Sequence, residues 1–303
     1  MKITLTGSLG HISKPLAQEL IQKGNDVTVI SSKPERQKEI EALGATAAIG
    51  TMEDADFLTT AFIGADAVYC MEAPGRFFDP TFNYIEHIKM QGHVFVDAIQ
   101  RSDVKRVVHL SSIGAHTDKG NGILAFHYHV EQILNTLPPD VAITFLRPVG
   151  FYYNLFAFIN TIKTEGVIGS NYGDNDKDPW VSPLDIATVA AEEITKQPSG
   201  GRKVRYIASD ELTCNEVAGI LGEAISKPDL KWVLISDDQM LNGMLAAGMN
   251  KEVAKGLVEM NASRRNGILY EDYYRHKPAL GKTKMRDFAK EFAAVYNISS
   301  IIE

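Results

Sequence analysis

Cysteine and long apolar runs are scarce in this sequence. Its 303 residues include two cysteines, Cys70 and Cys214, which are too few for a thiolate zinc site. No apolar run reaches the length of a bilayer-spanning helix, and the first residues do not form the apolar segment of a signal peptide. We therefore expect a cytoplasmic protein with no membrane-spanning segment, no structural disulfide and no bound metal.

Positive charge is in the minority as well. The chain carries 31 Lys and Arg residues against 38 Asp and Glu residues, for a net charge of -7. Nucleic acids and anionic membranes bind positive surfaces, so this balance argues against both as partners. Hydrophobic residues make up 45% of the chain and charged residues 23%, which is typical of a protein that buries a core. We expect a small-molecule substrate or a protein partner, and a monomer or homodimer.

The first half of the chain alternates short β-rich apolar runs with segments of helical periodicity. Strands are expected at residues 3–6, 27–30, 46–49, 67–71, 106–110 and 142–146, with helices between them. Such alternation predicts an α/β protein with a doubly wound parallel sheet.

The rhythm changes after residue 150. A helix is expected at 151–162, a polar loop at 166–178, a helix at 185–195, and strands at 203–207 and 232–235. Residues 1–150 are therefore expected to form a dinucleotide-binding core. Residues 151–303 should complete that core and form a small substrate or lid lobe.

A glycine turn between the first strand and the first helix is the strongest local signal. Its spacing is Gly7-x-x-Gly10-x-x-Ser13, in which serine replaces the third glycine of the usual dinucleotide-binding pattern. Glycines let a pyrophosphate approach the backbone, and the helix dipole attracts it. An ordinary tight turn would have the same residues, but the place of the turn in the first βα unit favours dinucleotide binding.

The end of the second strand indicates which dinucleotide is preferred. An acidic residue there would bind the ribose 2′-hydroxyl of NAD, whereas cations and hydroxyls suit the 2′-phosphate of NADP. The sequence has Ser31, Ser32, Lys33 and Arg36, with no acid at the strand end. We predict NADP(H) in preference to NAD(H), the alternative being that both cations are simply solvated.

Four further segments resemble the NmrA-like family of atypical short-chain dehydrogenases/reductases. They contain Gly64-x-Asp66-x-Val68, Ser111-Ser112, Leu146-Arg147-Pro148 with Asn154, and Asp185-Ile186-Ala187. The resemblance implies a Rossmann-type sheet, a bound NAD(P)(H) and a small C-terminal substrate lobe.

The Tyr-x-x-x-Lys pair of many short-chain dehydrogenases is missing from the expected helix. Tyr128 is followed four residues later by Gln132, and the pair Tyr273/Lys277 lies far outside the dinucleotide fold. Within the resemblance, His127 occupies the position that faces the nicotinamide. Its imidazole could hydrogen-bond a carbonyl that is being reduced or hold the cofactor ribose, and a structural histidine is the alternative.

Two sets of candidate site residues follow. The cofactor set is Gly7, Ser8, Leu9, Gly10, His11, Ile12, Ser31, Ser32, Lys33, Arg36, Met71, Ala73, Ser111, Ser112, His127, Pro148 and Phe151. The substrate set is Arg76, Phe151, Tyr152 and Asn154, with His127 as the catalytic candidate. Arg147 is expected to be structural.

The leading functional hypothesis is an NADPH-dependent reductase of a small organic acceptor such as a quinone or a conjugated carbonyl. The aromatic run at 151–153 suits a flat acceptor. The rival is a non-catalytic NADP(H)-sensing regulatory protein of the NmrA type, which the missing Tyr–Lys pair favours. An epimerase or isomerase is the weaker third hypothesis, because it commonly uses the missing pair.

Overall fold

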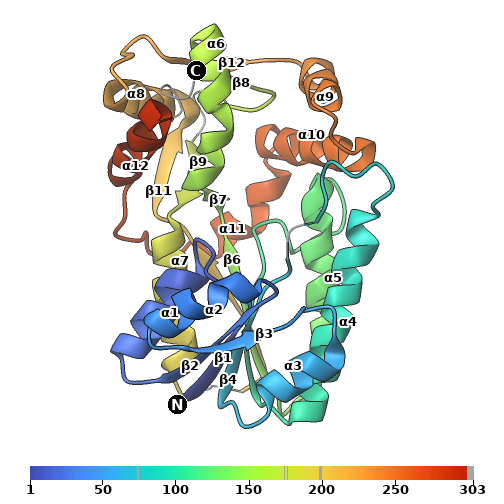
Figure 1. Cartoon of the computed structure of the whole chain (residues 1–303). Helices are drawn as coiled ribbons and strands as arrows, with labels where there is room; N and C mark the ends of the chain where they lie inside the picture. The colour runs from blue at the N-terminus through green and yellow to red at the C-terminus, as the bar shows by residue number, and fades with distance from the viewer. Residues whose placement is uncertain (74, 174, 176, 198–199, 299–303) are drawn as a thin grey trace.

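The computed structural model describes residues 1–73, 75–173, 175, 177–197 and 200–298. Its centre is a seven-stranded parallel sheet with helices on both faces, and a smaller group of strands and helices lies above it (Figure 1). The spatial order is β10 (Arg202–Ile207), β6 (Ala142–Pro148), β5 (Arg106–Leu110), β4 (Ala67–Cys70), β1 (Lys2–Leu5), β2 (Asp26–Ser31) and β3 (Thr46–Ile49). This topology confirms the predicted Rossmann-type α/β fold.

Two separate apolar cores hold the helices against the sheet. One contains α1 (Ser13–Gln22), α2 (Gln37–Ala42) and α7 (Pro183–Thr195). The other contains α3 (Ala55–Phe62), α4 (Tyr84–Ser102) and α5 (Ala125–Leu134). Because both faces are buried, neighbouring residues of one strand enter different cores, as Val107 and Val108 do. The sequence therefore shows continuous apolar runs where a half-exposed strand would alternate.

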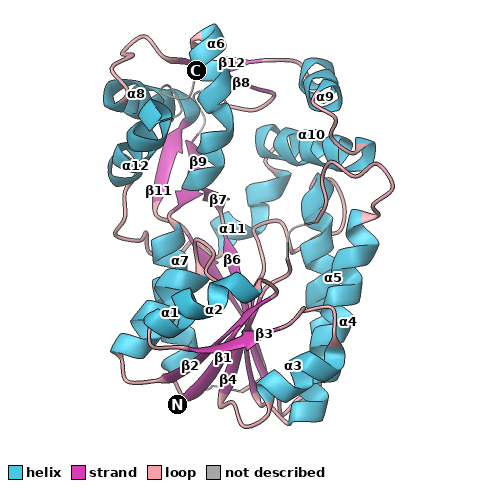
Figure 2. Cartoon of the chain, viewed as in Figure 1, coloured by secondary structure: helices cyan, strands magenta, loops and turns pink. Residues whose placement is uncertain are grey.

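The upper part of the molecule has smaller sheets of its own (Figure 2). Strands β11 (Asp210–Thr213), β9 (Lys177–Val181) and β7 (Gly150–Phe151) form one of them, and β12 (Lys231–Leu234) pairs with β8 (Val167–Ser170) in another. The helices of this part are α6 (Ile159–Glu165), α8 (Cys214–Ala224), α9 (Asp237–Ala246), α10 (Lys251–Arg265), α11 (Glu271–Arg275) and α12 (Met285–Ile298). We call the part formed by these small sheets and helices the upper lobe. The described chain as a whole also has short 3-10 helices, namely η1 (Pro34–Arg36), η2 (Gly122–Leu124), η3 (Tyr152–Phe158) and η4 (Ile268–Tyr270).

The prediction was wrong in the segment that follows residue 150. The expected helix at 151–162 begins as the 3-10 helix η3 and becomes α-helical only at Ile159. The expected loop at 166–178 contributes β8 and the start of β9. These strands are short and rich in glycine and polar residues, and each depends on a distant partner for its hydrogen bonds. A local pattern could not reveal them.

Asp66 and Asp185, which belong to the family-like segments of the sequence, hold parts of the fold together. The Asp66 carboxylate accepts a 2.7 Å hydrogen bond from the backbone N–H of Lys2, which fixes the start of β1 beside β4. The Asp185 carboxylate, at the start of α7, accepts hydrogen bonds from the hydroxyl of Ser209 at 2.6 Å and from the backbone of Thr283 at 3.1 Å. Asp185 thereby ties the segment before α12 to the central sheet.

A buried ionic network joins β6, α5 and α11. Arg147 donates to both carboxylate oxygens of Glu131, at 2.9 and 2.6 Å, and to the Asp272 carboxylate at 3.1 Å. The Arg147 and Glu131 side chains are 9% and 4% exposed. Ser111 donates to Glu131 as well, at 2.5 Å. Arg147 is therefore held by the fold, as its expected structural role requires.

We predict that breaking this network destabilises the protein strongly. Glu131→Gln removes the charge that compensates the buried guanidinium, so the free energy of unfolding should fall by about 3–5 kcal/mol. The exposed pair of Glu223 with Arg286 supplies the control, since Glu223→Gln should cost less than about 1 kcal/mol. Urea unfolding at unchanged m-value measures both losses. Equal losses in the two variants would show that the buried network does not stabilise the fold.

Candidate functional site

The glycine turn lies at the carboxyl end of β1 and is sterically closed around Gly7. Gly7 has φ +87°, and a Cβ placed on it would lie 2.5 Å from both Met71 Sδ and Ser13 Oγ. The same Cβ on Gly10 would meet only the carbonyl oxygen of Gly7, at 3.1 Å. Gly7 is therefore required by the fold, whereas Gly10 leaves its outer side open to a ligand.

Helix α1 begins immediately after this turn and has no counter-charge at its start. No acidic residue lies in its first turn, and no side chain of the described residues caps its N-terminal amides. The uncapped helix start and the helix dipole therefore form an anion-binding end. Together with the open side of Gly10, this end fits a pyrophosphate.

The end of β2 lies beside the turn. The Ser8 hydroxyl donates to Ser31 Oγ at 2.9 Å, and the backbone N–H of Lys33 donates to the same oxygen at 3.2 Å. Arg36 is already paired with Glu39 at 2.8 Å. Lys33 is exposed, and none of the ion pairs between described residues involves it. Lys33 is therefore the freer of the two predicted cations to bind a 2′-phosphate.

A cavity of about 580 Å³ extends from the turn to the upper lobe. It opens where the strand order reverses between β1 and β4, the usual ligand position in such sheets. Many predicted residues line it: Gly7, Gly10, His11, Ile12, Met71, Ala73, Ser111, Ser112, His127, Phe151 and Asn154.

The other predicted residues do not line this cavity. They are Ser8, Leu9, Ser31, Ser32, Lys33, Arg36, Pro148, Arg76 and Tyr152. Arg76 is 77% exposed and lies beside Asp79, at 3.8 Å. Tyr152 is fully buried, and its hydroxyl donates to the Asp210 carboxylate at 2.8 Å. The placement expected for Tyr152 on the substrate side was wrong, because the short helix η3 turns Tyr152 into the upper core. The substrate role of Arg76 stays a prediction.

Sequence reasoning missed several residues of the cavity wall, among them Glu72, Tyr84, Arg264 and Tyr270. Arg264, on α10, is the most constrained of them. Its guanidinium donates to Asp178 and to the Tyr270 hydroxyl, both at 2.9 Å, and lies 3.8 Å from the ring centre of Tyr172. No sequence motif identifies such a residue, because its partners come from distant segments of the chain.

Aromatic rings cross the cavity wall near the turn. His11 stacks on Tyr153 with ring centres 4.9 Å apart and an angle of 21°. Phe151 lies 5.4 Å from the same Tyr153 ring. The turn, β7 and η3 therefore bring three aromatic rings together at the cavity wall.

Burial governs the charge state of His127 on α5. It lowers the pKa of the imidazole to about 3, against the opposing effect of the Glu72 charge. Nδ1 of His127 is buried without a hydrogen-bond partner among the described residues. The ring is therefore neutral near pH 7 and can donate or accept a hydrogen bond, but it does not supply an acidic proton.

The Tyr-x-x-x-Lys pair near the C-terminus has no part in this cavity. Tyr273 is fully buried and donates to the Glu211 carboxylate at 3.0 Å. Lys277 pairs with the other oxygen of Glu211 at 2.6 Å. Neither lines the cavity, so this pair is structural.

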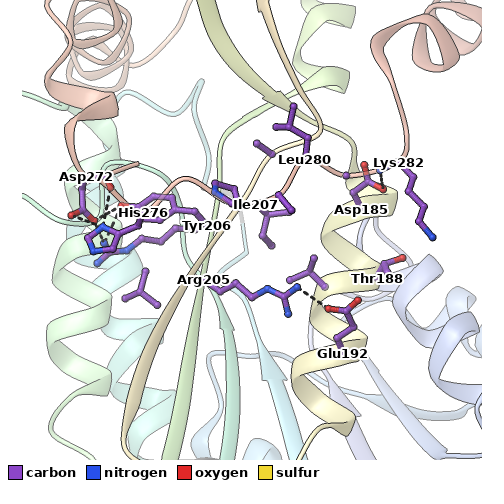
Figure 3. Close-up of a pocket in the computed structure, with 17 residues that line it drawn as sticks. Asp185, Thr188, Glu192, Arg205, Tyr206, Ile207, Asp272, His276, Leu280 and Lys282 are labelled. Atoms are coloured by element: carbon purple, nitrogen blue, oxygen red, sulfur yellow. Dashed lines mark hydrogen bonds and ion pairs between the residues drawn. The ribbon is translucent and has the colours of Figure 1, made fainter. Parts of the chain in front are cut away.

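A second cavity, of about 710 Å³, lies between α7, β10 and residues 278–282 (Figure 3). Figure 3 shows Arg205 paired with Glu192 across it, at 2.7 Å, and Asp272 directed toward Tyr206, at 2.6 Å. Arg205 and Asp272 there already have partners, and the cavity contains neither the glycine turn nor the start of α1. It is therefore not the dinucleotide site, although it is the larger cavity.

None of the helices in the described ranges is long and apolar enough to cross a bilayer. Within the same ranges, no group of three or more His, Cys, Asp or Glu side chains could hold a metal ion.

Comparisons with known proteins agree with this architecture. A family model described as the NmrA-like family matches residues 1–271. An NAD(P)H azoreductase of Xenophilus azovorans is 24% identical over 260 residues, which is 86% of each chain. An NADPH-dependent quinone oxidoreductase of Escherichia coli, solved with NADPH, superposes with a TM-score of 0.78 at 20% identity, over 95% of this chain and 99% of that one. Triphenylmethane reductase of Citrobacter sp., solved with NADP(H), superposes at 0.74 and 20% identity, over 96% and 99%.

We predict that Gly10→Val abolishes dinucleotide binding while the fold survives. The added side chain would occupy the open side of the turn, where only the carbonyl of Gly7 is close. NADPH should then no longer raise the melting temperature, whereas apo circular dichroism should match the wild type. Gly7→Ala is the contrasting variant, because its positive φ and its two close contacts should unfold the apo protein. A full thermal shift in Gly10→Val would place the pyrophosphate elsewhere.

Proposed function

The chain belongs to the NmrA-like family, and from that premise we propose that it is an NADPH-dependent reductase of a small, flat, conjugated acceptor such as a quinone. The observation that carries the proposal is the cavity at the switch point of the sheet. It joins an anion-binding turn at Gly7 and Gly10 to an aromatic wall at Phe151 and Tyr153.

The residues at the turn fit a dinucleotide. The uncapped start of α1 and the open side of Gly10 would bind the pyrophosphate, and Lys33 would bind a 2′-phosphate. The azoreductase uses NAD(P)H, and the two solved structures hold NADPH or NADP(H). We infer the same cofactor class for this chain.

When bound, the cofactor supplies a hydride from its reduced nicotinamide. The protein has to bind the acceptor against that ring, orient it and exclude water. The stacked His11 and Tyr153 rings and the tilted Phe151 ring beside them offer aromatic contacts for a flat acceptor. The azoreductase, the quinone oxidoreductase and the triphenylmethane reductase are named for conjugated acceptors of this kind.

His127 fits a positioning role within this function. Its neutral imidazole lines the cavity and can hold a carbonyl oxygen or a ribose hydroxyl by a hydrogen bond. A dedicated proton donor would need a pKa much closer to 7. We therefore assign His127 to orientation and assign the proton to another group.

The sensor hypothesis has one observation in its favour, since neither Tyr273 nor Lys277 lines the cavity. A sensor would bind NADP(H) tightly, reduce no acceptor, and show an affinity for its protein partner that changes with the redox state of the cofactor. The acceptor assay described below separates the two hypotheses.

We predict that Lys33 is responsible for the preference for NADPH. Lys33→Ala should weaken NADPH binding by about 1–3 kcal/mol, because a charge-assisted phosphate contact is lost, and should leave NADH binding unchanged. Lys38→Ala is the matched control, since Lys38 is an exposed cation in the first turn of α2. Calorimetric titration measures both cofactors in both variants. An undiminished preference in Lys33→Ala would contradict the assignment.

We predict that the protein oxidises NADPH when quinones or related conjugated carbonyls are added. His127→Ala should lower the turnover about ten-fold to a hundred-fold, as expected for lost orientation. Because the pKa of His127 is about 3, the ring stays neutral at higher pH, and the loss should be the same factor from about pH 5 to 9. Absorbance of the reduced nicotinamide measures both. If NADPH binds but is not oxidised with any quinone, aldehyde or enone of a panel, the sensor hypothesis is supported instead.

A further inference from the structure

A carboxylate–imidazole pair forms part of the cavity wall. Glu72 follows β4 by two residues and lines the cavity, and His109 lies on β5, where it is in register with Cys70. Glu72 Oε1 lies 2.8 Å from Nε2 of His109. The two side chains are 4% and 0% exposed.

Burying this pair costs free energy that a purely structural contact would not need to spend. Removing a carboxylate from water costs several kcal/mol, and an apolar pair of similar volume commonly serves stability as well or better. The other ring nitrogen of His109, Nδ1, is buried and has no hydrogen-bond partner among the described residues. The ionic network around Arg147, by contrast, uses both oxygens of Glu131 and several further partners. The incomplete bonding of His109 points to a task other than packing.

The other ionisable groups of the cavity wall are unsuited to proton transfer near neutral pH. Burial raises the pKa of the Tyr84, Tyr153 and Tyr270 hydroxyls above the ordinary value. Arg264 stays protonated, because its pKa is raised by Asp178 against the effect of burial. His127 is neutral, as shown above. Apart from the Glu72–His109 pair, His11 at the glycine turn remains among the described lining residues.

The charge of Glu72 is fixed by several neighbours. Burial favours its neutral form, but His109 outweighs burial by its charge and its hydrogen bond, so the pKa of Glu72 is lowered. Tyr69 and Cys70 on β4, Tyr84 on α4 and His127 on α5 are the other titratable groups that interact with Glu72. None of these four carries a positive charge near pH 7, since the two phenols and the thiol are neutral acids and His127 is unprotonated. Glu72 and His109 therefore act as one unit.

We propose that Glu72 passes a proton to the reduced acceptor and that His109 supplies this proton to Glu72. The inference rests on the reductase function proposed above. The acceptor gains a hydride from the reduced nicotinamide and becomes an oxyanion. Nε2 of a protonated His109 gives its proton to the Glu72 carboxylate, which passes it on to that oxygen. Afterwards Glu72 is a carboxylate, His109 is a neutral imidazole, and water in the open cavity restores the proton.

The charge balance of this step favours it in a buried site. The step requires the Glu72–His109 pair to hold one proton before the reaction and so to be neutral overall. After it the pair carries one negative charge, while the oxidised nicotinamide carries one positive charge. Opposite charges that arise together in a low-dielectric cavity stabilise each other.

Two acceptors test the assignment, because one needs a proton and the other does not. A quinone must gain a hydride and a proton, whereas a triarylmethane cation becomes neutral on gaining a hydride alone. Glu72→Gln should lower kcat for the quinone about a hundred-fold or more. It should leave kcat for the cation within about three-fold, although KM for the cation can rise with the lost negative charge.

Matched variants separate proton transfer from structural damage. Glu193 on α7 is a carboxylate of similar burial, 5% exposed, whose ion pairs with Lys203 and Arg205 lie outside the cavity. Glu193→Gln should leave kcat for both acceptors unchanged. Formic acid should restore quinone turnover to Glu72→Ala in a concentration-dependent way, because it can replace the missing proton donor. His11→Gln tests the rival donor and should slow neither acceptor selectively.

A measurement without turnover completes the test. Imidazole nitrogen shifts in the cofactor-free protein should show a charged His109 ring at pH 7 in the wild type and a neutral ring in Glu72→Gln. A neutral wild-type ring would overturn the proposal, as would equal slowing of both acceptors or selective slowing by His11→Gln. Failure of the wild type to reduce either acceptor would instead refute the reductase function, and the proton assignment with it.

Discussion

The close approach of β1 to β4 is the constraint on which the rest of this site depends. At the end of β1, the Thr6 hydroxyl accepts from the backbone N–H of Met71 at 2.8 Å, and the Ser13 hydroxyl donates to the Thr6 carbonyl at 3.0 Å. These bonds press the turn against β4 so closely that Gly7 has no room for a side chain. The same contact between the end of β1 and the end of β4 places the start of α1 beside Met71, Glu72 and Ala73. The anion-binding end and the residues that would face the acceptor are thus fixed by one local packing arrangement.

The upper lobe completes the cavity through a small number of strong long-range contacts. Arg264 reaches from α10 to Asp178 in β9 and to Tyr270 beside α11, and it lies over the ring of Tyr172. Asp272, two residues after Tyr270, is bound to Arg147 of the central sheet. One short segment therefore connects the guanidinium in the cavity wall with the ionic network in the core. Because both ends are tied, the lobe is held at a set distance from the glycine turn.

Sequence reasoning succeeded where the signal is local. The strands of the first half, the glycine turn at Gly7 and Gly10 and the missing acid after β2 are all short-range patterns, and the fold followed from them. It failed where partners are distant in sequence. Strand β8 pairs with β12 and strand β9 with β11 and β7, all distant or irregular in sequence, and Tyr152 turns away from the cavity because of η3. Glu72 and Arg264 belong to no recognised motif, and their meaning comes from His109, Asp178 and Tyr270, which only the fold brings to them.

The absence of a Tyr–Lys pair from this cavity changes what its wall has to accomplish. A phenol assisted by lysine carries its proton in a group that water can reach, and it can act at one exposed position. Here Tyr84 and Tyr270 of the wall are buried, and their raised pKa values keep them neutral. In the proposed reductase, orientation and proton supply are then separated: the aromatic rings of His11, Tyr153 and Phe151 hold a flat ligand, whereas Glu72 and His109 supply the proton. With these proposed roles, such a wall would accept many flat aromatic rings but could protonate a bound acceptor at only one position. It would therefore favour acceptors for which alignment with the nicotinamide limits the rate of reduction.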